Sequence, residues 1–151
     1  MLIQLTEGAL LVVLTVTIHG TVLGWIMWRL QQSPLTSRSL WRDSFLLARI
    51  AVWCVLAHLL EITLWAAFYA WQDVMPDIDV AWYFSAVTYA TIGYGDVTPP
   101  ELWRLLASVE GLTGILMCAW SGGFVFAVVT QLQETARAQQ TSTEHGRHRP
   151  G

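Results

Sequence analysis

The sequence predicts an all-α integral membrane protein with three transmembrane helices, first of all from its composition. Hydrophobic residues make up 54% of the 151 residues and charged residues only 13%, whereas soluble domains carry about 25% charged residues. Three apolar runs are each long enough to cross a bilayer core, which takes about 20 helical residues. These features exclude a water-soluble enzyme, and the net charge of -3 argues against a nucleic-acid partner.

The three apolar runs divide the chain into four parts. We expect a first transmembrane helix (1–30), a linker (31–49), a central region with two spans (50–132), and a cytoplasmic tail that is disordered (133–151). In the linker, Trp41, Phe45 and Ala48 fall on one helical face. This spacing fits a short interfacial helix, and it equally fits an early start of the second span.

The distribution of arginine predicts the orientation. The segment between the first two spans contains four arginines and one aspartate, whereas the segment after the second span carries Asp73, Asp77 and Asp79 and has no arginine before Arg104. Basic residues concentrate on the cytoplasmic side. We therefore expect a multi-pass protein of the cell membrane, with its N-terminus outside and its C-terminus in the cytoplasm.

A segment between the second and third spans is too short to cross the membrane and too apolar for an ordinary loop. Residues 79–90 predict a helix with Asp79 as its N-cap, and the residues that follow contain Gly93 and Gly95. Irregular backbone is tolerated at membrane depth only where it lines a water-filled or protein-lined path. The segment therefore predicts a re-entrant helix and loop that dip into the membrane and return.

The string Thr88-Tyr-Ala-Thr-Ile-Gly-Tyr-Gly-Asp96 resembles the selectivity filter of potassium channels, T-x-x-T-x-G-Y-G-D. This resemblance implies a pore domain at 50–132, made of an outer helix (50–72), a pore helix (79–90), a filter (91–96) and an inner helix (102–132). It also implies a homotetramer in the lipid bilayer, because one filter strand cannot surround an ion. K+ would be the permeant ion, conducted passively without an organic cofactor or an enzymatic step.

The resemblance also implies roles for individual residues. Backbone oxygens would form the ion sites, and glycine supplies the positive φ that aligned carbonyls require. The implied filter residues are Thr91, Ile92, Gly93, Tyr94 and Gly95. The implied supporting residues are Trp82, Tyr83, Thr88 and Asp96, of which Trp82 and Tyr83 would join Tyr94 in an aromatic cuff and Asp96 would attract cations at the outer mouth.

The third span contains two candidate gating residues. Gly114 lies where similar channels carry a hinge glycine, and close helix packing is the alternative role. Phe126 would form a hydrophobic constriction. Ionisable residues inside spans are costly and suggest function. His58, Glu61 and Glu110, with His19 in the first span, therefore form either a proton-sensitive network that modulates gating or interhelical hydrogen bonds that fix packing.

Two other classes of transport protein fit this segment less well than a potassium channel. A non-selective cation channel of the same architecture would depart from the Tyr-Gly part of the filter, and a transporter built of pore loops would carry four repeats per chain. A non-conducting scaffold or subunit remains open from the sequence.

Overall fold

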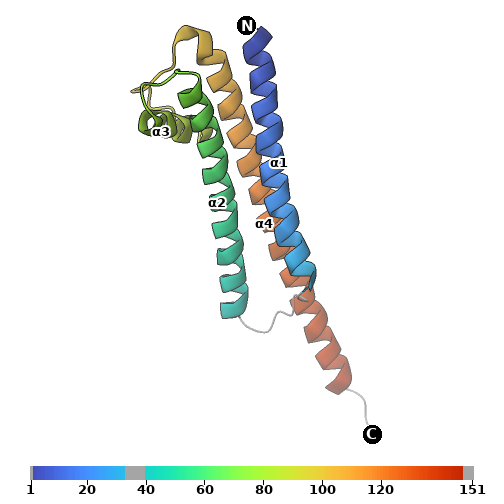
Figure 1. The fold of residues 1–151 in the computed structure, drawn as a ribbon. Helices are drawn as coiled ribbons and strands as arrows, with labels where there is room; N and C mark the ends of the chain where they lie inside the picture. The colour runs from blue at the N-terminus through green and yellow to red at the C-terminus, as the bar shows by residue number, and fades with distance from the viewer. Residues whose placement is uncertain (1, 33–39, 148–151) are drawn as a thin grey trace.

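The computed structural model describes residues 2–32 and 40–147. It contains four α-helices, α1 (Leu2–Gln32), α2 (Leu40–Trp71), α3 (Ile78–Tyr89) and α4 (Arg104–Arg147), with a short 3₁₀ helix at Glu101–Trp103. Three helices are long and apolar enough to cross a membrane, at Thr6–Gln32, Trp41–Trp71 and Glu101–Thr141. Helices α1, α2 and α4 lie side by side as a bundle, and α3 packs against one end of the bundle, where it contacts both α2 and α4 (Figure 1).

The bundle core consists of two apolar clusters with a polar layer between them. One cluster, around Trp65, Tyr69 and Phe84, joins α2 and α3 to the starts of α1 and α4. The other joins Leu23, Ile50 and Val128 at the opposite end. Between them lie buried polar side chains, which only hydrogen bonding makes tolerable in a membrane.

The first helix is an integral part of the bundle. A Cβ added at Gly20 would lie 3.3 Å from the Trp120 ring on α4, whereas a Cβ added at Gly24 would meet nothing within 4 Å. Hydrogen bonds tie α1 to α2 at Glu7–Gln72 (2.9 Å) and at Thr15–Trp65 (3.0 Å). Of the two glycines, only Gly20 therefore allows close packing of α1 on α4 within the subunit.

The bounds of α2 and α3 differ from the predicted ones in two places. Helix α2 is continuous from Leu40, so residues 40–49 belong to the second span, which starts early, and do not form a separate interfacial helix; Ser39 lies outside the described residues. Asp77 rather than Asp79 caps α3, since its side chain accepts a hydrogen bond from the Val80 amide at 2.8 Å. Asp79 lies in the first turn, where a carboxylate also interacts well with the helix dipole.

The prediction that the tail is disordered from residue 133 is wrong, because α4 continues to Arg147. Residues 131–141 are rich in Gln, Ala, Arg and Glu, all good helix formers. No glycine or proline interrupts the helix between residue 123 and Gly146. Residues 148–151 lie outside the described part of the chain.

Candidate functional site

The segment 91–96 follows α3 directly and is held by its last carbonyl groups. The amide of Thr91 donates to the Thr88 oxygen (2.9 Å), and the amides of Ile92 and Gly93 donate to the Val87 oxygen (2.8 and 3.1 Å). Carbonyls at the end of a helix have no partner within it. The segment thus satisfies them and is fixed to α3 at its start.

The backbone of this segment alternates in handedness. Thr91, Gly93 and Gly95 have positive φ values of 57°, 55° and 79°. The two glycines adopt this conformation without cost, as their positions predicted. Thr91 does so as well, which the sequence did not indicate, because a β-branched residue is strained at positive φ. Nothing lies within 4 Å of a Cβ added at Gly93 or Gly95, so backbone conformation rather than crowding accounts for both glycines.

Side chains around segment 91–96 divide into those that hydrogen-bond within the subunit and those that are largely exposed. The Tyr83 hydroxyl donates to Asp96 (2.7 Å), and this hydrogen bond holds the pKa of the Asp96 carboxyl below its usual value. The Trp82 indole donates instead to Thr63 on α2 (3.1 Å). Tyr94 is 69% exposed and Ile92 is 53% exposed. Of the predicted cuff residues, only Tyr83 is bonded to the segment within one chain.

Gly114 lies directly behind the end of α3. A Cβ at Gly114 would sit 2.0 Å from the Tyr89 carbonyl oxygen and 3.0 Å from its ring. At Gly111, one turn earlier, the Thr88 oxygen would lie 3.3 Å away. These contacts support the packing role of Gly114 over the hinge role, because glycine there lets α4 approach the α3 backbone. Phe126 is 72% exposed on the same helix.

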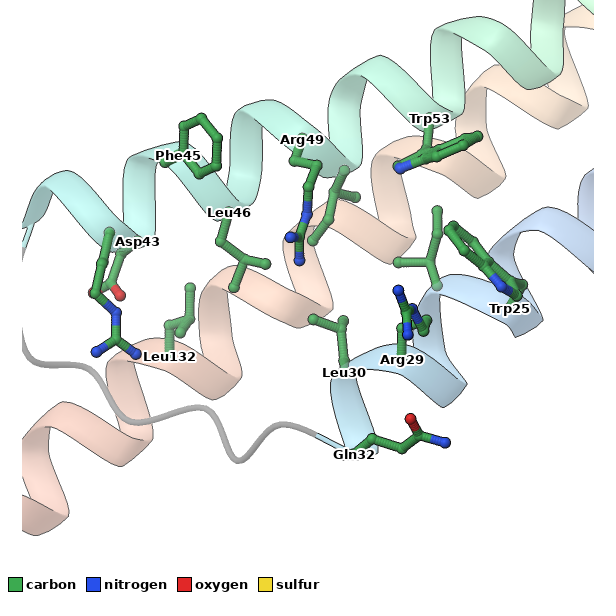
Figure 2. A pocket seen from close by; sticks show the side chains of 13 residues that line it. Trp25, Arg29, Leu30, Gln32, Asp43, Phe45, Leu46, Arg49, Trp53 and Leu132 are labelled. Carbon is green, nitrogen blue, oxygen red and sulfur yellow. The ribbon is translucent and has the colours of Figure 1, made fainter.

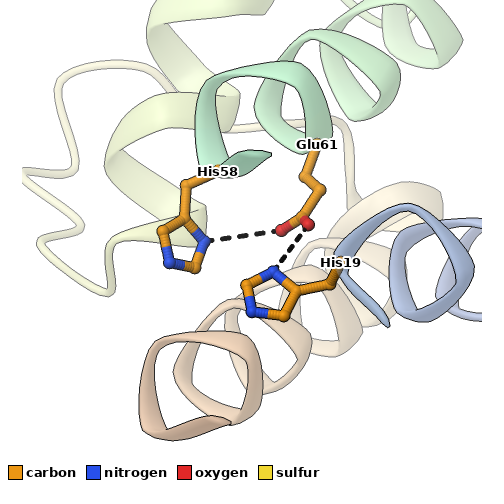
Figure 3. A group of neighbouring side chains, drawn as sticks. All are labelled: His19, His58 and Glu61. Atoms are coloured by element: carbon orange, nitrogen blue, oxygen red, sulfur yellow. Dashed lines mark hydrogen bonds and ion pairs between the residues drawn. The ribbon is translucent and has the colours of Figure 1, made fainter. Parts of the chain in front are cut away.

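A cluster of buried polar side chains joins all four helices at Tyr89, the last residue of α3. His19 Nδ1 lies 2.9 Å from one oxygen of Glu61, and His58 Nδ1 lies 3.4 Å from the other, as Figure 3 shows. The Tyr89 hydroxyl donates to Glu61. Ser121 of α4 lies 3.1 Å from His19 Nε2 and 3.3 Å from His58 Nε2. We call these five residues the His–Glu cluster.

The His–Glu cluster has the donor atoms for a metal ion as well as for hydrogen bonds. The ligand atoms of His19, His58 and Glu61 lie within 4.8 Å of one another. Each of these side chains is already hydrogen-bonded inside the protein. Sequence spacing placed His58 and Glu61 on one face, and His19 was a candidate because it is ionisable inside a span. Tyr89 comes from a distant segment, and no local pattern indicated its part in this cluster.

Glu110 belongs to a separate buried group nearer the other end of α3. Its carboxyl group accepts a hydrogen bond from the Tyr69 hydroxyl (2.8 Å) and lies next to the Ser85 hydroxyl. Ser85 also contacts the carbonyl of Ile62 (3.0 Å). This group ties α3 to α2 and α4, and among the described residues its hydrogen bonds do not involve the His–Glu cluster.

The amino-acid sequence of this region matches a known protein family. The family model described as ion channel matches residues 55–131, which include α3, segment 91–96 and most of α2 and α4. No curated protein and no solved structure matches the chain. The matched region covers half of the chain and includes more than half of two of the three helices that can span a membrane. The chain therefore belongs to the ion channel family and is a multi-pass membrane protein.

Proposed function

We propose that this protein is a potassium-selective channel in which residues 91–96 of four identical subunits form the filter, α3 is the pore helix and α4 lines the cavity. The observation that carries the proposal is the alternation of positive φ at Thr91, Gly93 and Gly95 in a Thr-Ile-Gly-Tyr-Gly-Asp string. Alternating handedness turns successive carbonyls toward one side, and rings of carbonyl oxygens replace the hydration shell of K+.

The exposure of the segment supports the tetramer. Ile92 and Tyr94 have no enclosing partner in the described part of one chain, although an ion site requires oxygens on all sides. Helix α4 also exposes Leu112, Ile115 and Phe126, at 61%, 53% and 72%. A fourfold arrangement would bring these groups together around one axis. It would place Asp96 at the mouth, on the side opposite to the arginine-rich linker.

Replacing Gly93 by alanine tests the filter directly. The substitution costs about 1–2 kcal/mol per chain, because an L-residue is disfavoured at positive φ, and four subunits multiply that cost. A Cβ there meets nothing within 4 Å, so the cost acts on the backbone conformation alone. We expect K+ flux into proteoliposomes to fall at least tenfold in Gly93→Ala.

Gly24→Ala is the matched control, since its Cβ also meets open space but lies in α1. It should conduct like the unmodified protein. Equal flux in Gly93→Ala and Gly24→Ala would contradict the filter assignment. An absence of K+ flux from the unmodified protein, at every voltage and pH tried, would support a non-conducting scaffold instead.

The hydrogen bond between Tyr83 and Asp96 predicts how acid acts on the channel. Because this bond lowers the Asp96 pKa, the carboxylate stays charged until the pH falls below the usual range for aspartate. Tyr83→Phe removes the bond, so the pKa rises and the charge is lost at a higher pH. In Tyr83→Phe, we therefore expect K+ current at low salt to decrease at a higher pH than in the unmodified channel.

Asp96→Asn is the reference for this experiment, since it carries no charge at any pH. Its current at low salt should be smaller at neutral pH and should lack the acid-dependent component that Asp96 contributes. An identical acid titration for Tyr83→Phe and the unmodified channel would show that the bond does not set the charge at the mouth.

A further inference from the structure

A cavity of about 600 Å³ lies between the end of α1 and the start of α2 (Figure 2). Three arginines line it, Arg29 from α1 and Arg42 and Arg49 from α2, together with a single carboxylate, Asp43. The formal charge of the lining is therefore +2. A cationic cavity of this kind selects an anion, and it lies far from segment 91–96, at the other end of the bundle.

The remaining lining is apolar and aromatic. Trp25, Leu30, Phe45, Trp53 and Leu132 all contribute to the walls. The cavity lies where the apolar part of α1 ends and that of α2 begins, which is the depth of the membrane–water interface. A ligand that fills it must therefore carry a negative charge at one end and hydrocarbon at the other.

The arginines are arranged to receive an oxyanion. Arg29 lies over the Trp25 ring at 5.8 Å from its centroid, and Trp25 contacts Trp53 edge-on at 4.9 Å, so the aromatic pair limits the freedom of Arg29. In the described part of the chain, the guanidinium of Arg49 has no hydrogen-bond or ion-pair partner. It extends from α2 toward α1 (Figure 2). Guanidinium groups bind phosphate oxygens in pairs, a geometry that lysine cannot offer.

We propose that this cavity binds an anionic phospholipid, with the phosphate between Arg29 and Arg49 and the acyl chains along Leu30, Phe45 and Leu132. The charge, the depth and the mixed lining each point to the same ligand. Basic pockets between transmembrane helices bind such headgroups in other membrane proteins. The bound lipid would bridge α1 to α2 at the end of the bundle where segment 33–39 connects them, and so would stabilise the position of α1.

The test measures lipid binding to the purified full-length protein in detergent by native mass spectrometry. The probes are dioleoyl phosphatidylglycerol and, as the zwitterionic counterpart, dioleoyl phosphatidylcholine. We expect phosphatidylglycerol to bind more tightly. Each arginine near an anionic lipid contributes roughly fivefold in affinity, so Arg29→Gln/Arg49→Gln should weaken phosphatidylglycerol binding about 25-fold and leave phosphatidylcholine binding unchanged.

Arg104→Gln is the matched control. Arg104 is 61% exposed at the opposite end of the bundle and lies 3.9 Å from Glu101, so its replacement removes one positive charge, as each cavity substitution does, but spares the cavity. Arg49→Lys keeps the charge and should lose affinity to an intermediate extent, a comparison that holds even if the double variant folds poorly. Glycerol 3-phosphate and inorganic phosphate, added at millimolar concentration, distinguish a headgroup site from a lipid site.

Retained affinity in Arg104→Gln, with loss in the double variant and graded loss in Arg49→Lys, supports the proposal. An equal loss of phosphatidylglycerol affinity in Arg104→Gln would mean that net charge alone attracts the lipid. Equal affinity for phosphatidylglycerol and phosphatidylcholine would mean that the cavity does not distinguish anionic from zwitterionic headgroups. Displacement of phosphatidylglycerol by inorganic phosphate would mean that the cavity binds a free anion. Each of these three results would overturn the assignment.

Discussion

Gly114→Ala is expected to abolish K+ conduction and to reduce the yield of assembled protein. The added Cβ would lie 2.0 Å from the Tyr89 carbonyl oxygen and 2.8 Å from its carbonyl carbon. Both are backbone atoms, which cannot rotate away as a side chain could. Overpacking of this kind costs about 1–3 kcal/mol or more in each subunit. The end of α3 would have to move, and segment 91–96, which it holds, would move with it. Size-exclusion chromatography and K+ flux measure the two effects.

The matched control for this prediction is Gly122→Ala on the same helix. A Cβ at Gly122 meets nothing within 4 Å, so the subunit should fold and assemble normally. A hinge role for Gly114 makes a different prediction, namely a normally assembled Gly114→Ala protein with altered opening. Normal yield and thermal stability in Gly114→Ala would therefore contradict the packing role.

Glu61→Ala is expected to give the largest loss of stability among the buried polar substitutions. The Glu61 carboxylate receives hydrogen bonds from α1 and α3, through His19 and Tyr89. Its removal leaves these buried donors without an acceptor, and breaking a buried pair in this way costs about 3–5 kcal/mol. We expect the midpoint of thermal unfolding to fall by several degrees or more, and K+ flux to fall because Tyr89 directly precedes the filter region.

Two further variants separate this effect from a general loss of polarity in the membrane. Glu61→Gln keeps one carbonyl oxygen and should lose roughly half as much stability. Thr21→Val changes an exposed hydroxyl that bonds only within its own helix, to Thr17 (2.7 Å), and should be neutral. Equal stability of Glu61→Ala and Thr21→Val would show that the His–Glu cluster does not hold the bundle together.

Much of the fold could be predicted from local features. The three long apolar runs coincide with helices that can span a membrane, because the bilayer sets their length whatever they pack against. Gly93 and Gly95 were predicted to have positive φ, and both do, since that conformation is a property of single residues. The early start of α2 was one of two alternatives for the linker, and only the continuous helix decides between them.

The remainder depends on tertiary contacts that sequence spacing does not contain. The strained φ of Thr91 is imposed by its hydrogen bond to α3 rather than favoured by threonine. His19 and Glu61 are separated by 42 positions, and their pairing follows only from how α1 packs on α2. In the same way, the sequence left two roles for Gly114, whereas its contact with the Tyr89 backbone supports one of them.

The most direct test of potassium selectivity is the reversal potential of the purified protein in planar bilayers, with KCl on one side and NaCl on the other. A filter of aligned carbonyls at residues 91–95 predicts a reversal close to the K+ equilibrium potential, lost in Gly93→Ala. A reversal near zero, with cation current in both directions, would contradict the proposed selectivity and would identify a non-selective cation channel of the same architecture.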